Sequence, residues 1–121
     1  MSAAVHDNPA WVAARPTLSV LIPFLRDDPD TLIALLNREA SALDGSVEAV
    51  LLDDGTADAA LTARLIARID GCALPIRLLT LSANEGRSIG RNRLAAAARG
   101  SSLLFLDSDM RPDHDRFVQT W

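Results

Sequence analysis

Short apolar segments alternate along this chain with longer segments whose apolar residues recur at helical spacing. The apolar segments cover residues 18–22, 47–52, 76–81 and 103–106, which is the length of buried strands. The intervening segments have room for the helical crossover that parallel strands require. Repeated units of about thirty residues predict an α/β fold with a doubly wound, mainly parallel sheet. Because the strands are almost continuously apolar, we expect helices on both faces of that sheet.

Turn and capping residues indicate where the intervening helices begin. Asp28 precedes Pro29, a combination typical of a helix N-terminus, and Thr56 is a candidate N-cap for the next helix. A third helix is predicted over residues 88–99 and a last one from Pro112 onward.

The first part of the chain carries no comparable pattern. We interpret residues 1–16 as a flexible leader and residues 17–121 as one domain. The leader lacks the apolar core of a secretory signal, and no apolar run reaches the roughly 18 residues of a membrane span. The single cysteine, Cys72, excludes an internal disulfide and fits a reducing compartment, so we expect a cytoplasmic protein.

The charges argue against nucleic acid as a partner. The formal net charge is −4, and the sequence contains no basic stripe and no aromatic ladder. All 12 basic residues are arginine. The absence of lysine excludes any mechanism that requires one within this chain.

Polar residues gather at the predicted carboxyl ends of the strands, where open parallel sheets bind ligands. The strand ends deliver Asp-Asp-Gly at 53–55, Asn-Glu-Gly-Arg at 84–87 and Asp-Ser-Asp at 107–109. The loops at the opposite edge resemble simple caps and turns. This asymmetry predicts that the binding site lies at the carboxyl edge.

Asp107 and Asp109 have two interpretations. In extended backbone, residues two apart point to the same side, so both carboxylates can face one hard cation such as Mg²⁺ or Mn²⁺. The alternative is a strand-end turn in which the second aspartate caps the next helix. The residues alone favour neither.

Four arginines lie on the helix predicted before the last strand. Arg87 and Arg91 are one turn apart near its start, where a shared anion and plain solvent exposure are both reasonable. Arg93 and Arg99 are interpreted as an exposed helix face. A dinucleotide or P-loop glycine motif after the first strand is absent.

Four stretches, in this order and spacing, resemble the family 2 glycosyltransferases of GT-A fold. They are LSVLIPF, VEAVLLDDGTAD, NEGRSIGRNRLAAAARG and LLFLDSDMRPD, and the resemblance runs from about residue 18 to 112. It implies the Rossmann-like half of an inverting, metal-dependent enzyme. Such an enzyme transfers sugar from a nucleoside-diphosphate sugar, most often a uridine nucleotide, to an acceptor.

The resemblance also implies roles for particular residues. Pro23 and Phe24 would border the base, and Asp53 and Asp54 would hydrogen-bond the base and ribose. The nucleotide and diphosphate would be lined by Gly86, Arg87, Arg91 and Asn92.

Asp107 and Asp109 would form the D-x-D motif of the family. One would point toward the ribose or donor sugar, and the other would hold the Mn²⁺ or Mg²⁺ that bridges the diphosphate.

Family members continue for roughly another hundred residues, which supply the acceptor site and the catalytic base. We therefore expect the general base beyond residue 121, an inactive fragment, and self-association through an exposed edge or apolar face. The main alternative is a nucleotide-binding module without turnover. A haloacid dehalogenase-type phosphatase and a receiver domain are remote alternatives, because both need a lysine that the chain lacks.

Overall fold

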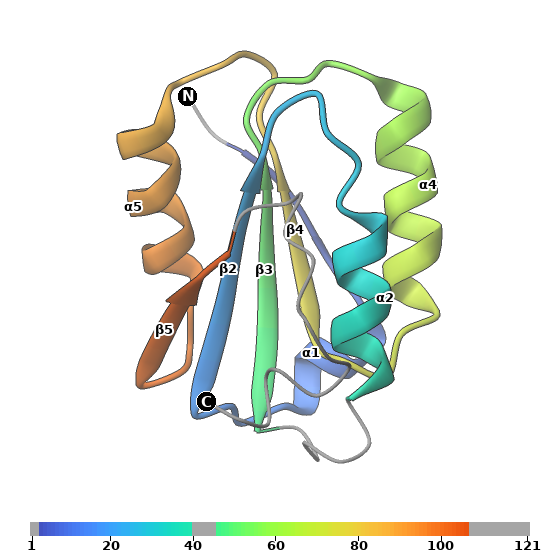
Figure 1. The fold of residues 1–121 in the computed structure, drawn as a ribbon, viewed down its shortest axis with the longest axis vertical. Coiled ribbons are helices and arrows are strands. Elements are labelled where there is room, and N and C mark those ends of the chain that lie inside the picture. Colours follow the sequence, from blue (N-terminus) through green and yellow to red (C-terminus); the bar gives the residue numbers. More distant parts are fainter. Residues whose placement is uncertain (1–2, 40–45, 107–121) are drawn as a thin grey trace.

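The structure is a computed structural model that describes residues 3–39 and 46–106. Five strands form one sheet in this part of the chain (Figure 1). The strands are β1 (Ala4–Asp7), β2 (Leu18–Phe24), β3 (Val47–Asp53), β4 (Ile76–Thr80) and β5 (Ser102–Phe105). The helices are α1 (Pro9–Ala13), α2 (Asp30–Arg38), α4 (Ala59–Asp70) and α5 (Arg87–Ala97). The strand order is β1-β4-β3-β2-β5.

Strands β2 to β5 are parallel to one another, and β1 is antiparallel to β4 at one edge. The helices α2, α4 and α5 are the crossovers that return the chain to the start of each next strand. This arrangement confirms the predicted α/β fold with a mainly parallel sheet.

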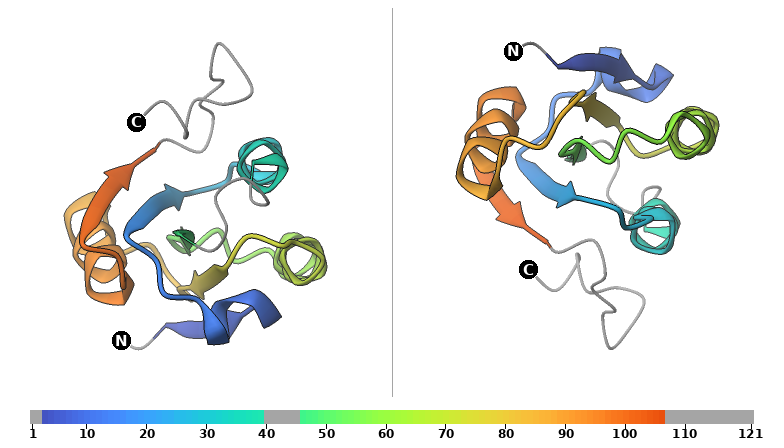
Figure 2. Two further views of the ribbon diagram at one scale, coloured as in Figure 1. Left: turned by 90° about the horizontal axis from the view of Figure 1, so that it is seen from below. Right: turned by 90° about the horizontal axis from the view of Figure 1, so that it is seen from above.

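The two faces of the sheet carry separate apolar clusters because successive side chains of a strand alternate in direction. In β3, Ala49 and Leu51 pack with α2 and α4, whereas Val50 and Leu52 pack with α5 and Trp11. Figure 2 shows α2 and α4 on one side of the sheet and α5 on the other. The predicted cover of both faces is therefore confirmed.

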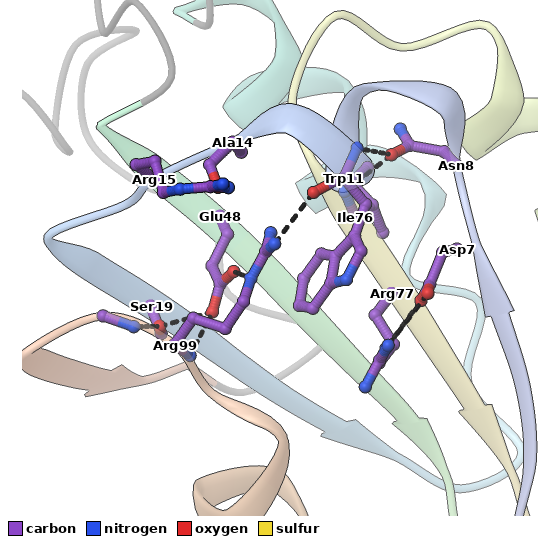
Figure 3. A network of polar contacts seen from close by, with 11 residues as sticks. Asp7, Asn8, Trp11, Ala14, Arg15, Ser19, Glu48, Ile76, Arg77 and Arg99 are labelled. Carbon is purple, nitrogen blue, oxygen red and sulfur yellow. Dashed lines mark hydrogen bonds and ion pairs between the residues drawn. The ribbon is translucent and has the colours of Figure 1, made fainter.

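The N-terminal segment belongs to the fold, so the prediction of a flexible leader was wrong for residues 4–14. Strand β1 pairs with β4, and Trp11 of α1 is only 4% exposed. Asn8 is fully buried, and its Nδ2 donates to the carbonyls of Ile69 and Leu74. Its Oδ1 accepts from the backbone N of Trp11 and of Ile76 (Figure 3). A strand of four residues is too short for a periodicity signal, so it is ordered by tertiary contacts, which also include the Asp7–Arg77 ion pair.

Two predicted helix starts differ in detail. Asp58, not Thr56, caps α4, because its Oδ1 accepts a hydrogen bond from the backbone N of Leu61. Helix α2 begins at Asp30, and Asp28 accepts from the Asp30 backbone N. The predicted last helix lies outside the described residues.

None of the helices that the structure describes is both long and apolar enough to cross a bilayer.

Candidate functional site

The carboxyl ends of β2, β3 and β4 meet at one edge of the sheet, at the top of Figure 1. There the Asp54 carboxylate joins the loop after β3 to the loop after β4. Its Oδ1 accepts from the Glu85 backbone N at 2.9 Å, and its Oδ2 accepts from Asn84 Nδ2 at 3.2 Å. Asn84 Nδ2 also lies 3.2 Å from the Asp54 carbonyl oxygen. These contacts hold the β4–α5 loop in one position at the edge.

The strand pattern explains why Asp54 faces α5. Side chains two residues apart share a face, and Leu52 belongs to the cluster that packs with α5. The ladder also continues past the strand ends, because the Asp54 backbone N donates to the Phe24 carbonyl at 2.9 Å. Asp54 is 8% exposed, so its carboxylate has little contact with solvent and faces the β4–α5 loop.

Gly55 allows the two loops to approach each other. Its φ is +89°, and a Cβ at this position would lie 2.3 Å from the carbonyl carbon of Ala83 and 2.3 Å from the Asn84 N. Both are backbone atoms, which cannot give way as a flexible side chain can. Glycine at position 55 is therefore required by the local geometry of the edge.

Asp53 faces the opposite side of the sheet and links to the loop after β2. Its Oδ1 accepts from the Thr56 backbone N at 2.9 Å, and Thr56 Oγ1 accepts from the Arg26 backbone N at 2.8 Å. Arg26 has a left-handed backbone, with φ of 61°. Asp53 is 2% exposed, so in this structure it shapes the loop. Thr56, expected to cap a helix, instead connects two edge loops.

An open hollow of about 610 Å³ lies beside this link, between the loops after β2 and β3 and the start of α4. Arginines and aspartates both line it. The lining residues are Arg26, Asp27, Asp28, Thr56, Ala57, Asp58, Ala59, Leu61 and Arg64.

Glu85 is fixed by an arginine of α5. Arg93 Nε donates to Glu85 Oε1 at 2.7 Å, and Arg93 Nη2 donates to Oε2 at 3.2 Å. The hydrogen bond from Arg93 lowers the pKa of the Glu85 carboxyl, outweighing the opposing effect of desolvation. The interpretation of Arg93 as an exposed helix face was therefore wrong: it holds the loop that Asp54 also holds.

The predicted diphosphate residues lie at the start of α5, but they do not act as a set. Gly86 is the N-cap with φ of +96°, and Arg87 follows it as an exposed residue without a hydrogen bond or ion pair to any described residue. Asn92 is also exposed. The guanidinium of Arg91 instead lies over the Phe105 ring, 4.0 Å from its centroid. The guanidinium of Arg91 thus contacts Phe105, whereas Arg87 is exposed and can still bind an anion.

Pro23 and Phe24 end β2. Pro23 is partly buried, and Phe24 is 3% exposed within the apolar cluster that contains α2 and α4 residues. The ring of Phe24 is a core group in this structure, and its assignment to the base stays a prediction.

Asp107 and Asp109, the predicted metal ligands, lie outside the described residues. Within residues 3–39 and 46–106, no three His, Cys, Asp or Glu side chains are grouped so that they could hold a metal ion.

Three residues make contacts at this edge that the sequence pattern did not indicate, although it placed Asn84 and Glu85 among the polar residues there. Thr56, Asn84 and Glu85 fix the loops by hydrogen bonds across about thirty residues of sequence. The only local signal was the glycine after two aspartates, which indicates a close backbone approach but not its partner.

The comparisons with known proteins agree with this arrangement. A sequence model of the family described as glycosyl transferase family 2 matches residues 19–120. Glucosyl-3-phosphoglycerate synthase of Mycolicibacterium paratuberculosis is 31% identical over 127 residues, covering 93% of this chain and 36% of that protein. Succinoglycan biosynthesis protein ExoO of Rhizobium meliloti is 32% identical over 111 residues, covering 90% of this chain and 30% of that protein.

A third relative, the uncharacterized glycosyltransferase YfnE of Bacillus subtilis, is 30% identical over 92 residues, covering 76% of this chain and 23% of that protein. These matches show that the chain belongs to family 2 of the glycosyltransferases, and its α/β fold agrees with that family. The chain spans 23 to 36% of the length of these relatives.

Proposed function

We propose that this chain forms the donor-binding part of an inverting glycosyltransferase that takes its sugar from a nucleoside-diphosphate sugar, with uridine as the base. The observation that carries the proposal is the family match over residues 19–120, together with the ordered carboxyl edge around Asp54. Open parallel sheets bind nucleotides at this edge.

Asp54 and Arg87 are the described residues assigned to the donor. Each carboxylate oxygen has two lone-pair positions, so Asp54 can accept from a base or ribose while it holds Asn84 and Glu85. Arg87 lies at the first turn of α5, where its charge and the free backbone N–H groups attract a diphosphate. Gly86 allows close approach there, since nothing lies within 4 Å of a Cβ built on it.

Asp107 and Asp109 are assigned to Mn²⁺ or Mg²⁺. When bound, the ion neutralises charge on the departing nucleoside diphosphate. The general base that activates the acceptor hydroxyl is assigned to the part of the enzyme beyond residue 121. We place the enzyme in the cytoplasm.

Calorimetry with uridine diphosphate tests the proposal on the 121-residue chain. We expect weak binding that requires MnCl₂ and is lost on chelation, and we expect Asp109→Ala to lose the metal-dependent part. Asp115→Ala, which removes a carboxylate of the same type outside the D-x-D pair, is the control. Equal affinity with and without metal would contradict the metal assignment, and no binding of any uridine nucleotide would contradict the donor assignment.

The same preparation separates the two candidate functions. Incubation with a uridine-diphosphate sugar should release no free sugar if the chain only binds the donor. Release of sugar would show turnover by the chain itself.

A further inference from the structure

Glu48 is a buried carboxylate that the proposed donor site does not use. It lies near the amino end of β3 and is 0% exposed. Its Oε1 accepts from Arg99 Nε at 2.7 Å, and its Oε2 accepts from the Arg99 backbone N and from Ser19 Oγ, each at 2.7 Å (Figure 3). A buried charge needs both a counter-charge and hydrogen bonds, and Glu48 has both.

These contacts hold the turn between α5 and β5. Ser19 Oγ, which donates to Glu48, accepts from the Gly100 backbone N at 2.8 Å. A Cβ on Gly100 would lie 2.8 Å from the Leu18 carbonyl carbon and the Ser19 N, so the turn packs directly against the β2 backbone. Glu48 therefore fixes two consecutive residues of this turn relative to β2 and β3.

Arg99 is also held from its other side by the N-terminal segment. Its Nη1 donates to the Trp11 carbonyl at 2.9 Å, and its guanidinium lies 3.7 Å from the centroid of the Trp11 ring. The arginine cannot follow a shift of β5 without losing contacts to both β3 and α1.

Strand β5 depends on such an anchor. It has only four residues, Ser102–Phe105, and β2 is its only partner among the described strands. A slip of one residue in the pairing with β2 would turn every side chain of β5 to the other face. The last described contact is the Leu106 backbone N donating to the Leu21 carbonyl at 3.0 Å, and Asp107 follows directly in the sequence.

We propose that Glu48 is a positioning residue for the donor site: through Arg99 and Ser19 it sets the register of β5, the strand that precedes Asp107 and Asp109 in the sequence. The role in binding rests on the proposed function, whereas the role in setting β5 does not.

The variant Glu48→Gln tests the proposal. The glutamine amide group must face Arg99 Nε or the Arg99 backbone N, both of which are donors, so one contact is lost together with the charge. Asp7→Asn is the matched control. It weakens the Asp7–Arg77 pair, of 2.6 and 2.8 Å, which packs against the same tryptophan but does not contact β5.

Amide hydrogen exchange is the first measurement. The amides of Ser102 and Leu106, which donate to the carbonyls of Thr17 and Leu21, should exchange about tenfold faster in Glu48→Gln and at the wild-type rate in Asp7→Asn. Unchanged exchange at both amides would overturn the proposal. If Glu48→Gln does not fold, Ser19→Ala decides the matter, because it removes the hydrogen bonds of Ser19 to Glu48 and Gly100, leaves the Glu48–Arg99 pair in place and should accelerate exchange at Ser102.

Affinity for uridine diphosphate with MnCl₂ is the second measurement. It should fall about tenfold in folded Glu48→Gln and stay at the wild-type value in Asp7→Asn. Faster exchange with unchanged affinity would overturn the positioning role and leave Glu48 a structural residue. Absence of binding by the wild-type chain would refute the proposed function, and the exchange experiment would still decide whether Glu48 sets β5.

Discussion

The two ends of the parallel sheet are stabilised by different chemistry. At the carboxyl ends, the carboxylates of Asp53 and Asp54 accept hydrogen bonds from the backbone of neighbouring loops. At the amino ends, Glu48 is paired with the Arg99 guanidinium, and Trp11 lies against it (Figure 3). At the carboxyl ends, no arginine pairs with Asp53 or Asp54 among the described residues. At the amino ends, the charge of Glu48 is neutralised by Arg99. One end is thus fixed by hydrogen bonds from loop backbone to carboxylates, and the other by a neutralised ion pair that holds strands in place.

The largest effect is expected at Gly55 on the carboxyl side. Gly55→Ala should lower the free energy of unfolding by at least about 4 kcal/mol, because the methyl group would overlap two backbone atoms and the φ is left-handed. Urea denaturation measures the change. Gly86→Ala is the control: it has a similar φ of +96° but open space around it, and it should cost about 1–2 kcal/mol. Equal costs for the two variants would show that the close approach of the loops does not matter.

An intermediate effect is expected at Asn8 on the amino side. Asn8→Asp removes the two donors that satisfy the Ile69 and Leu74 carbonyls and places a charge there, so unfolding free energy should fall by about 3 kcal/mol. Asn37→Asp is the matched control, since the described bonds of Asn37 use only its Oδ1, which accepts from the backbone N of Ala73 and of Leu74.

Chemical denaturation of both variants at neutral pH provides the comparison. The Asn37 variant should lose less than about 1 kcal/mol, because a carboxylate can accept the same hydrogen bonds. A similar loss in both variants would mean that the amide donors of Asn8 contribute little.

The smallest effect is expected from Glu85 at the carboxyl-end loop. Because Arg93 lowers its pKa below the usual 4.5, the ionised pair contributes to stability above that pH. The contribution is lost as pH falls through the lowered pKa. A titration of the Glu85 carboxyl carbon by nuclear magnetic resonance should show the low pKa, and Arg93→Gln should return it toward the usual value. Arg91→Gln, which removes the charge over Phe105, should leave it unchanged.

The strands and crossover helices could be predicted because burial of apolar runs is a local property of the sequence. Residues 47–52 were predicted as a strand, and β3 spans Val47–Asp53. The first strand could not be predicted, because Ala4–Asp7 is short and only half buried. Its place in the sheet depends on Asn8, whose partners lie more than sixty residues away.

The candidate site could be predicted only as a location. The carboxyl edge and the Asp54 position followed from strand alternation, and the structure places Asp54 there. The environment of Phe24 did not follow, because a strand-end aromatic residue can face either the ligand or the core. In the structure its ring packs in the core.

The sequence by itself determined the parallel α/β architecture and the edge at which polar residues collect. The close approach of two loops that requires glycine at position 55 exists only in the folded chain. Tertiary structure alone decided what each arginine does. Arg93 binds Glu85 eight residues away, Arg91 covers Phe105, and Arg99 binds Glu48 across 51 residues. The physical reason is that a helical pattern shows which residues share a face. A long, charged side chain then pairs with whichever carboxylate, carbonyl or ring the folded chain places within its reach.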